Sequence, residues 1–471
     1  MRGGIGAGAG RSLLLPGDHS LLLRLLRTPT VGPLEAGPGA YDRWERWRGD
    51  RHGGLWRAQR AYARTARAAG LRVVHHACPP AGVLHRPDVP AALRRRADAD
   101  PSFLARQPNL VLRLGPDLPP AATVMFNVHL DTVAGREPVG FDGTRFTGRG
   151  AVDAKGPAVA LLAGVRAARA ACPRIGRRVA VLVQAVGGEE GGAMGVHGTR
   201  PLIESGYTGR LNVFCEPTGL RYLPRATAAM TARITVTGED AVDDRPEHGH
   251  NATVLLGFLA QHLATALDGR PPGGRAPAGR AADGRVADGR TPDGRVCVAG
   301  LHTGHLHNRV YGQGSLLLNL SYATAEQGAV LERAVTEAVA DGLRAFTARF
   351  ADSPPFARTA ADAAAVTRLQ WDKRGLPCLT GTDPWAESLL SAAGALRWPD
   401  DEPAFTCDAV WAHGLPDAFT AVLGPGRLED NHAHAAGEFA DLADLEAFAR
   451  LVSRLLITFA ERTPWPVTSN Q

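Results

Sequence analysis

Short apolar runs alternate with longer alanine- and leucine-rich stretches along most of the chain. The short runs are rich in valine, as buried strands are, and the longer stretches have the spacing of amphipathic helices. Strands that alternate with helices build a mostly parallel sheet covered by helices, so the sequence predicts an α/β fold. The predicted strands are VMFNVHL (124–130), VAVLVQAV (179–186), LNVFC (211–215) and FTAVLG (419–424), and the predicted helices are 156–171 and 441–462.

A different pattern interrupts this alternation in the second half of the chain. The chain has 471 residues, which is too long for one ordinary hydrophobic core. We expect a main domain in two parts, 1–228 and 348–471, with a compact α+β domain, 229–347, inserted between them. The inserted domain is predicted from the strands MTARITVTG (230–238) and SLLLNLSYAT (315–324) and the helices 251–267 and 329–346.

The inserted domain contains a repeat in which Gly-Arg recurs every five residues, over 268–295. A segment so rich in glycine, proline and arginine buries too little apolar surface to offset the entropy of ordering it. We predict a disordered loop there. Expansion of a GC-rich tandem repeat is the favoured origin, and a basic tether for an acidic partner is the alternative.

The formal charge of +6 comes from scattered arginines, since only two of the 53 basic residues are lysines, Lys155 and Lys373. No aromatic-rich basic face appears, so we expect no nucleic-acid partner. No apolar run is long enough to span a membrane, and the N-terminus is a poor signal peptide. The six cysteines are widely spaced and are predicted to be free thiols in a reducing cytoplasm, with Cys215 and Cys297 buried in apolar runs.

Residues that bind metal ions follow four of the predicted strands. In open α/β sheets, ligands collect beyond the carboxyl ends of the strands. Such a gathering of carboxylates repels itself without cations, and with histidine nitrogens it suits Zn, Mn or Co. The residues are His129 and Asp131, Glu189 and Glu190, Glu216, and His432 and His434, and a further carboxylate, Asp153, precedes the helix 156–171.

Each of these residues has a plainer interpretation when it is taken alone. His129 fits a core histidine, the two glutamates fit a helix start, and Asp153 fits a turn. Their joint occurrence at four strand ends favours a metal site. The adjacent glutamates then have a function, because successive residues of an extended chain point to opposite sides. One glutamate binds metal while its neighbour takes a proton from water acidified by the metal.

With these residues identified, the chain resembles the co-catalytic zinc exopeptidase and deacylase family. That family includes acetylornithine deacetylase, succinyl-diaminopimelate desuccinylase, carboxypeptidase G and aminoacylase. The resemblance runs from LLLRLLRTPTV (21–31) to the closing helix. Its motifs are HLDTV, GRGAVDAKGP, GGEEGGAMG, CEPT, and GPG followed by AHAAGE. It implies a zinc-peptidase-like catalytic domain, with the inserted domain as its lid and dimerisation domain.

The resemblance implies a role for each matching residue. Glu189 would be the general base and Asp131 would orient the first histidine. The last ligand has two candidates, because AHAAGE favours His434 with Glu438, whereas counting from GPG favours His432; His434 is preferred. The implied metal ligands are His129 and Glu216 for the first ion, Glu190 and His434 for the second, and Asp153 as the bridge.

Asn308, in HLHNRVYGQG, matches a lid asparagine that contacts substrate, but the lid departs from the family twice. The lid histidine that polarises the scissile carbonyl falls where Val242 stands, and the lid arginine that receives a substrate carboxylate falls where Ser321 stands. His248 and His250 lie near the first position, at the start of the following helix, and are not an obvious replacement. A cluster beside Asn308 could serve instead of the arginine, but loop roles are favoured for its members, His302, His305 and His307.

The sequence therefore predicts a cytoplasmic, homodimeric hydrolase that uses two divalent ions, zinc foremost with cobalt or manganese as alternatives. Its substrate would be a small, specialised molecule with an amide bond, such as an N-acyl amino acid or peptide. Two alternatives stay open. One is an amide- or ring-forming enzyme of a biosynthetic pathway on the same fold, and the other is a catalytically impaired metal-binding homologue.

Overall fold

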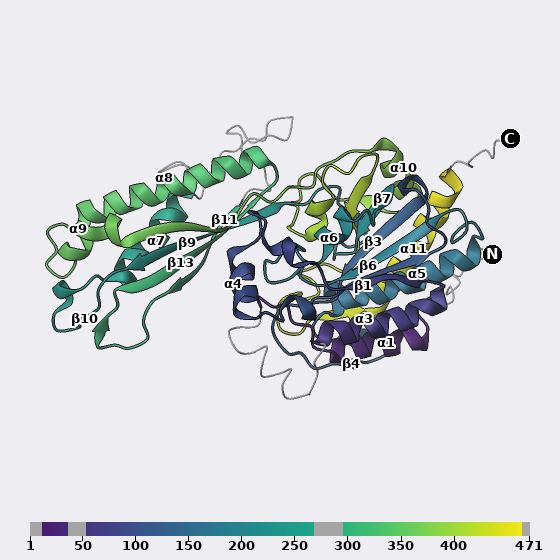
Figure 1. The fold of residues 1–471 in the computed structure, drawn as a ribbon, viewed down its shortest axis with the longest axis horizontal. Coiled ribbons are helices and arrows are strands. Elements are labelled where there is room, and N and C mark those ends of the chain that lie inside the picture. Colours follow the sequence, from purple (N-terminus) through teal and green to yellow (C-terminus); the bar gives the residue numbers. More distant parts are fainter. Residues whose placement is uncertain (1–11, 36–52, 268–294, 464–471) are drawn as a thin grey trace, which may run out of the picture.

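The computed structural model describes residues 12–35, 53–267 and 295–463, and these form two units side by side (Figure 1). One unit is built around a six-stranded sheet and the other around a four-stranded sheet. The predicted disordered loop, 268–295, lies outside the described residues except for its last residue.

The six-stranded sheet carries the strands that the sequence predicted. Strands β6, β3, β7 and β16 are adjacent and parallel, while β1 and β2 extend the sheet in antiparallel fashion. The α/β fold with a mostly parallel central sheet is thus confirmed. In sheet order the strands are β1 (Arg72–Ala77), β2 (Asn109–Leu114), β6 (Ala180–Val186), β3 (Thr123–His129), β7 (Leu211–Phe214) and β16 (Phe419–Val422).

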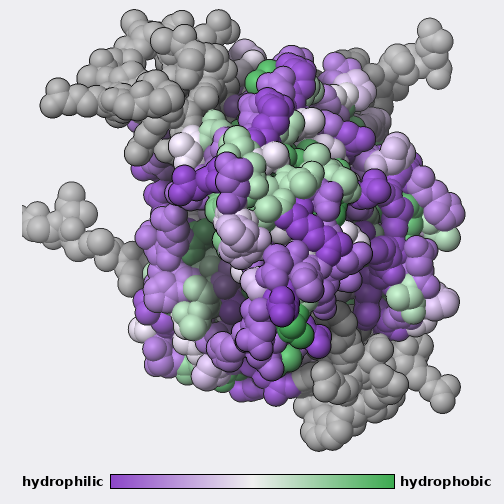
Figure 2. All heavy atoms as spheres, turned by 90° about the vertical axis from the view of Figure 1, so that its left-hand side faces the viewer, coloured by the Kyte–Doolittle hydropathy of each residue, from purple (hydrophilic) through white to green (hydrophobic). Residues whose placement is uncertain are grey.

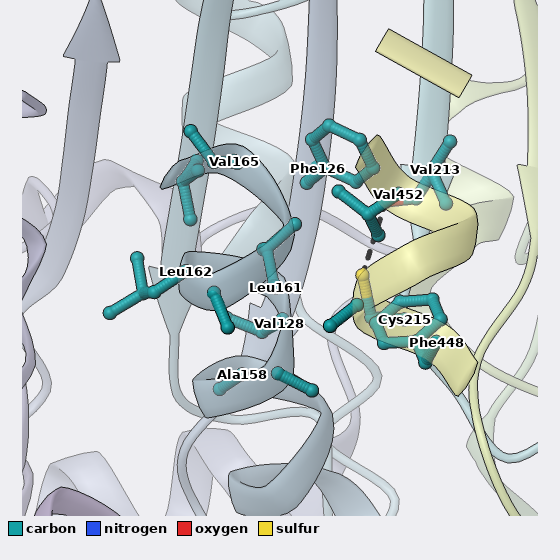
Figure 3. Close-up of a cluster of buried hydrophobic side chains, with 14 of the residues drawn as sticks. Phe126, Val128, Ala158, Leu161, Leu162, Val165, Val213, Cys215, Phe448 and Val452 are labelled. Carbon is teal, nitrogen blue, oxygen red and sulfur yellow. Dashed lines mark hydrogen bonds between the residues drawn. The ribbon is translucent and has the colours of Figure 1, made fainter. Parts of the chain in front are cut away.

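Two long helices cover one face of this sheet, α5 (Gly156–Ala171) and α11 (Leu442–Arg462). Alternate residues of β3 point to opposite faces, so Phe126 and Val128 pack with α5 and α11 while Met125 joins a second core on the other face (Figure 3). The two helices approach closely at Gly164, where a Cβ would stand 2.6 Å from the carbonyl oxygen of Ala449. Helices α1 (Pro16–Arg27) and α3 (Gly53–Ala66) pack on the same side.

The second unit is an antiparallel sheet with two helices on it. Its strands, in sheet order, are β11 (Arg295–His302), β13 (Gln313–Tyr322), β9 (Ala228–Thr237) and β14 (Thr367–Lys373), and its helices are α7 (Ala252–Leu267) and α8 (Ala325–Phe350). Leucines of α7 and the alternate residues of β9 and β13 form its core. Strand β14 belongs to this sheet although it follows the domain boundary predicted at residue 347.

Shorter elements complete both units. The helices are α4 (Ala91–Ala99), α6 (Thr199–Glu204), α9 (Ala357–Val366) and α10 (Pro384–Ala392). The short strands are β4 (Gly140–Phe141), β5 (Arg145–Thr147), β8 (Arg221–Tyr222), β10 (Ala241–Val242), β12 (Arg309–Val310), β15 (Leu396–Arg397) and β17 (Phe439–Asp441).

All six cysteines are free, as predicted. Cys215 is buried against α11, but the prediction that Cys297 is buried was wrong (Figure 3). Cys297 lies on β11, an edge strand whose side chains are largely exposed. Across the described ranges, no helix combines the length and the apolar character needed to cross a membrane.

Candidate metal centre

The carboxyl ends of three neighbouring strands bring the predicted ligands together. Strand β3 ends at His129, β6 is followed by two glycines and then Glu189 and Glu190, and Glu216 comes two residues after β7. Because these strands are adjacent and parallel, the residues that follow them meet at one edge of the sheet. Asp153 reaches the same edge from the turn that precedes α5.

A first group of donor atoms is formed by His129, Asp153 and Glu216, all of which are buried. One ligand atom from each lies within 4.8 Å of the others. His129 Nε2 is 2.8 Å from Asp153 Oδ1 and 3.6 Å from Glu216 Oε2. One histidine nitrogen and two carboxylates are therefore directed at a common point.

A second group consists of Asp153, Glu190 and His434. His434 Nε2 lies 3.0 Å from Asp153 Oδ2 and 3.2 Å from Glu190 Oε1. Asp153 is common to both groups, and its two oxygens face the two different histidines. This arrangement is what a carboxylate that bridges two cations requires.

The electrostatics of the cluster call for cations. Burial raises the pKa of Glu190 to about 7, and burial likewise raises the pKa of Glu216 to about 7. Hydrogen bonds to Asp153 and Glu190 raise the pKa of His434 to about 11. Without metal ions, bound protons on Glu190, Glu216 and His434 thus offset the negative charge of the cluster. Divalent cations would supply the missing positive charge, and the mixed nitrogen and oxygen donors fit zinc, cobalt or manganese.

Asp131 connects the two sides of the cluster. Its backbone oxygen lies 3.0 Å from His129 Nδ1, and its Oδ2 accepts the N–H of Glu190 at 3.1 Å. The first contact fixes the orientation of the His129 ring, so that Nε2 faces Asp153. The second contact fixes the loop that carries the two glutamates.

Glu189 lies beside the cluster but differs from its neighbour. It is partly buried, and it forms a third donor group with His129 and Glu190. Burial and the adjacent Glu190 raise its pKa well above the ordinary value. The turn before it requires Gly188, whose φ is +80° and where a Cβ would stand 2.3 Å from His197 Nε2. The tight loop thus presents both glutamates to the cluster, with one ligand atom each of Glu189, Glu190 and His129 within 4.8 Å of one another.

The loop after β16 brings His434, rather than His432, to the cluster. Both residues have positive φ, 62° and 55° respectively, so the chain folds back on itself between them. The His432 ring packs edge-on against Phe439, with centroids 5.8 Å apart. Of the two candidates for the last ligand, only His434 contacts Asp153 and Glu190 within the described residues.

Glu438 has a positioning role that sequence reasoning missed. It is 1% exposed and accepts the backbone N–H groups of Gly150, Val152 and Asp153 at 3.0, 3.2 and 3.3 Å. Arg149 Nη1 donates to it at 2.8 Å. Glu438 therefore fixes the turn that carries Asp153. Its only sequence signal was the spacing from His434.

Two further polar residues near the glutamates were also missed. Asp408 is fully buried and accepts a hydrogen bond from Thr199, and burial raises its pKa to about 6. Lys373, at the end of β14, is 6% exposed. Burial lowers the pKa of Lys373 to about 8, and the charge of Glu189 opposes this shift. Neither residue stands at a spacing that a sequence pattern identifies.

The predicted lid residues are not brought to the cluster within this chain. Asn308 is exposed next to β12, which pairs with β10 at the far end of the second unit (Figure 1). Val242 is 59% exposed on β10. His250 has a structural role, because its Nδ1 accepts the N–H of Glu239 and its Nε2 lies 3.1 Å from Asp362. The remaining candidate histidines, His248, His302, His305 and His307, are exposed.

Comparison with known proteins agrees with this geometry. A family profile described as "Peptidase family M20/M25/M40" matches residues 125–458. A putative [LysW]-lysine/[LysW]-ornithine hydrolase from Aeropyrum pernix is 35% identical over 160 residues, which are 33% of this chain and 42% of that protein. The match thus spans less than half of that relative's length.

Two solved structures share the fold at low sequence identity. The M20 family metallo-carboxypeptidase Sso-CP2 from Sulfolobus solfataricus is 12% identical with a TM-score of 0.62, and the alignment covers 95% of this chain and 100% of that one. Human carnosine dipeptidase 1 is 15% identical with a TM-score of 0.60, over 94% and 97% of the two chains. At these identities the likeness shows the fold alone.

Proposed function

The chain belongs to peptidase family M20/M25/M40, and from this premise we propose that it is a dinuclear metal-dependent hydrolase of an amide bond. The observation that carries the proposal is Asp153, whose two oxygens face His129 and His434 from two overlapping donor groups. A single structural ion would not need two groups that share one carboxylate.

In this proposal His129, Asp153 and Glu216 hold one ion, and Asp153, Glu190 and His434 hold the other. When bound, the two ions acidify water and polarise the carbonyl of the scissile amide. Glu189 accepts the proton from water and delivers it to the leaving nitrogen. Burial and the neighbouring Glu190 raise the pKa of Glu189 above that of an ordinary carboxyl group, which favours its uptake of a proton. Asp131 keeps the His129 ring directed at the first ion.

For the substrate we propose an acyl derivative of a basic amino acid. The Aeropyrum pernix relative is named for hydrolysis of LysW-linked lysine or ornithine. Val242 and Ser321 stand where the family's usual lid groups would be, which supports a substrate gripped differently from those of ordinary deacylases.

We further propose a homodimer formed through the second unit. The face in Figure 2 is mostly hydrophilic but carries hydrophobic side chains among the polar ones. The second unit has exposed apolar side chains at Val242, Leu301, Leu306 and Val330. Strand β11 is an edge strand of its sheet within the described part of the chain. A second copy, or closure of the two units, would have to bring Asn308 to the metal centre.

The test is hydrolysis by zinc-loaded protein of a pool of N-acetyl, N-succinyl and N-formyl amino acids and dipeptides that includes the lysine and ornithine derivatives. Mass spectrometry would detect the products. Glu189→Gln is the matched control, because the amide keeps the size of the side chain but cannot take a proton. We expect this variant to retain two metal ions per chain and to lose at least 100-fold in turnover. Full activity in Glu189→Gln would disprove the assigned base.

A further inference from the structure

The two lysines of this arginine-rich chain are both buried, but their surroundings differ. Lys155 is 1% exposed, and its Nζ donates to the backbone oxygens of Leu25 at 3.1 Å and Thr28 at 3.2 Å. It therefore joins α1 to the turn before α5. Lys373 is 6% exposed, yet its Nζ makes no hydrogen bond or ion pair with any residue that the structure describes.

An irregularity in strand β14 sets the direction of the Lys373 side chain. A β-bulge interrupts the pairing of β14 with β9 between Trp371 and Lys373, so that Lys373 lies opposite Thr231. Bulges re-aim side chains in this way. The intervening Asp372 accepts a hydrogen bond from Arg233 Nε at 3.1 Å and lies 3.7 Å from Arg95. Asp372 is thus occupied on its own side of the strand.

The ammonium group of Lys373 borders the loop that carries the paired glutamates. Its Nζ is 3.5 Å from the point where a Cβ on Gly192 would stand, and among the described residues beyond the two chain neighbours of Gly192 it is the only atom within 4 Å of that point. Lys373 also lies close enough to Glu189 to feel its charge. The side chain of Lys373 is largely buried, the charge that acts on its ammonium is that of Glu189, and no hydrogen bond joins it to the described residues, so a bound anion would complete its contacts.

We propose that Lys373 binds the carboxylate of the substrate, and that the enzyme therefore acts on N-acyl amino acids whose carboxylate is free. This inference rests on the proposed function. A carboxylate one carbon from the scissile nitrogen would reach the ammonium while the amide lies beside Glu189. Ser321, at the position of the family's arginine, is on β13, two strands from β14 in the same sheet. In this proposal the cation that binds the substrate carboxylate stands on β14, whereas the family's arginine would stand on β13.

The scarcity of lysine gives a direct binding assay on the full-length, zinc-loaded protein. Protein labelled with [ε-13C]lysine has two lysine signals, and Lys373→Met assigns them. The probes are N-methanesulfonyl-L-lysine, whose sulfonamide does not hydrolyse, and its carboxamide. We expect the carboxylate probe to shift the Lys373 signal and leave the Lys155 signal unchanged, and the carboxamide probe to shift neither. An unmoved Lys373 signal at saturating carboxylate probe would overturn the proposal.

Kinetics separate this proposal from the proposed function. Wild-type protein should prefer Nα-acetyl-L-lysine to Nα-acetyl-L-lysinamide. Lys373→Met should lower kcat/KM for the carboxylate substrate about 10- to 100-fold more than for the amide substrate, with the difference mainly in KM. Lys373→Arg should restore part of the preference, and metal content should stay at two ions in both variants.

Equal losses on both substrates, or loss of metal, would show that Lys373 only balances charge and would refute the proposal. A Lys373 signal that shifts in a protein without hydrolase activity would uphold the carboxylate site and refute the proposed function instead.

Discussion

Replacing Glu438 by glutamine should loosen the turn that carries Asp153. One carboxylate oxygen, Oε2, accepts both the N–H of Gly150 at 3.0 Å and Arg149 Nη1 at 2.8 Å, and the other accepts the N–H groups of Val152 and Asp153. In Glu438→Gln one oxygen becomes an NH2 group, which faces two donors whichever way the amide turns. Each buried donor left unsatisfied costs about 1–3 kcal/mol.

We therefore expect Glu438→Gln to lower the free energy of unfolding by about 2–6 kcal/mol and the affinity for metal by about 10- to 100-fold. Urea denaturation followed by tryptophan fluorescence gives the first quantity, and competition with a chelator gives the second.

Glu204→Gln is the matched control. Glu204 pairs with Arg86 and, one helical turn away, with Arg200, and its own side chain is 42% exposed, so its replacement should cost only about 1 kcal/mol. A Glu438→Gln variant that is no less stable than Glu204→Gln, and that binds metal as tightly as wild type, would refute the positioning role of Glu438.

Three further predictions follow from local geometry. Gly164→Ala should lower the free energy of unfolding by about 1–3 kcal/mol, because the new Cβ would meet Ala449 and Val452. Gly257→Ala, at an open position of α7, should raise it by up to about 1 kcal/mol, and urea denaturation measures both changes. Burial lowers the pKa of His197 from 6.5 to about 4. The metal-free protein should therefore lose on the order of 3 kcal/mol of unfolding free energy as the pH falls from 6.5 to 4, and His197→Leu should flatten this dependence. Parallel curves of unfolding free energy against pH for wild type and His197→Leu would contradict this. Chelation of the metal should lower the Tm of wild-type protein and leave the Tm of Asp153→Asn nearly unchanged, and an equal drop in both would argue against Asp153 as a ligand.

The strands that end at the metal centre could be predicted because they are buried on both faces. β3, β6, β7 and β16 read as continuous apolar runs, and each lies within two residues of its predicted bounds. Strands β11 and β14 escaped prediction since one is an exposed edge strand and the other, TRLQWDK, is mostly polar. Their pairing with β13 and β9 is a tertiary property that the local pattern does not carry.

The residues of the candidate site also fall into those that the sequence identified and those that it did not. Spacing along the chain identified the residues that follow strands, His129, Glu190 and Glu216, because topology alone brings strand ends together. It did not separate His434 from His432, since the answer depends on two residues with positive φ in an irregular loop. The roles of Glu438 and Lys373 depend on a backbone turn and on a β-bulge, which no spacing rule predicts.

Anomalous diffraction at the zinc edge from zinc-loaded crystals tests the central claim most directly. We predict two peaks about 3.5–4 Å apart, one on each side of the Asp153 carboxylate. His129 and Glu216 would lie at the first peak, and Glu190 and His434 at the second. A single peak, or peaks that Asp153 does not join, would contradict it.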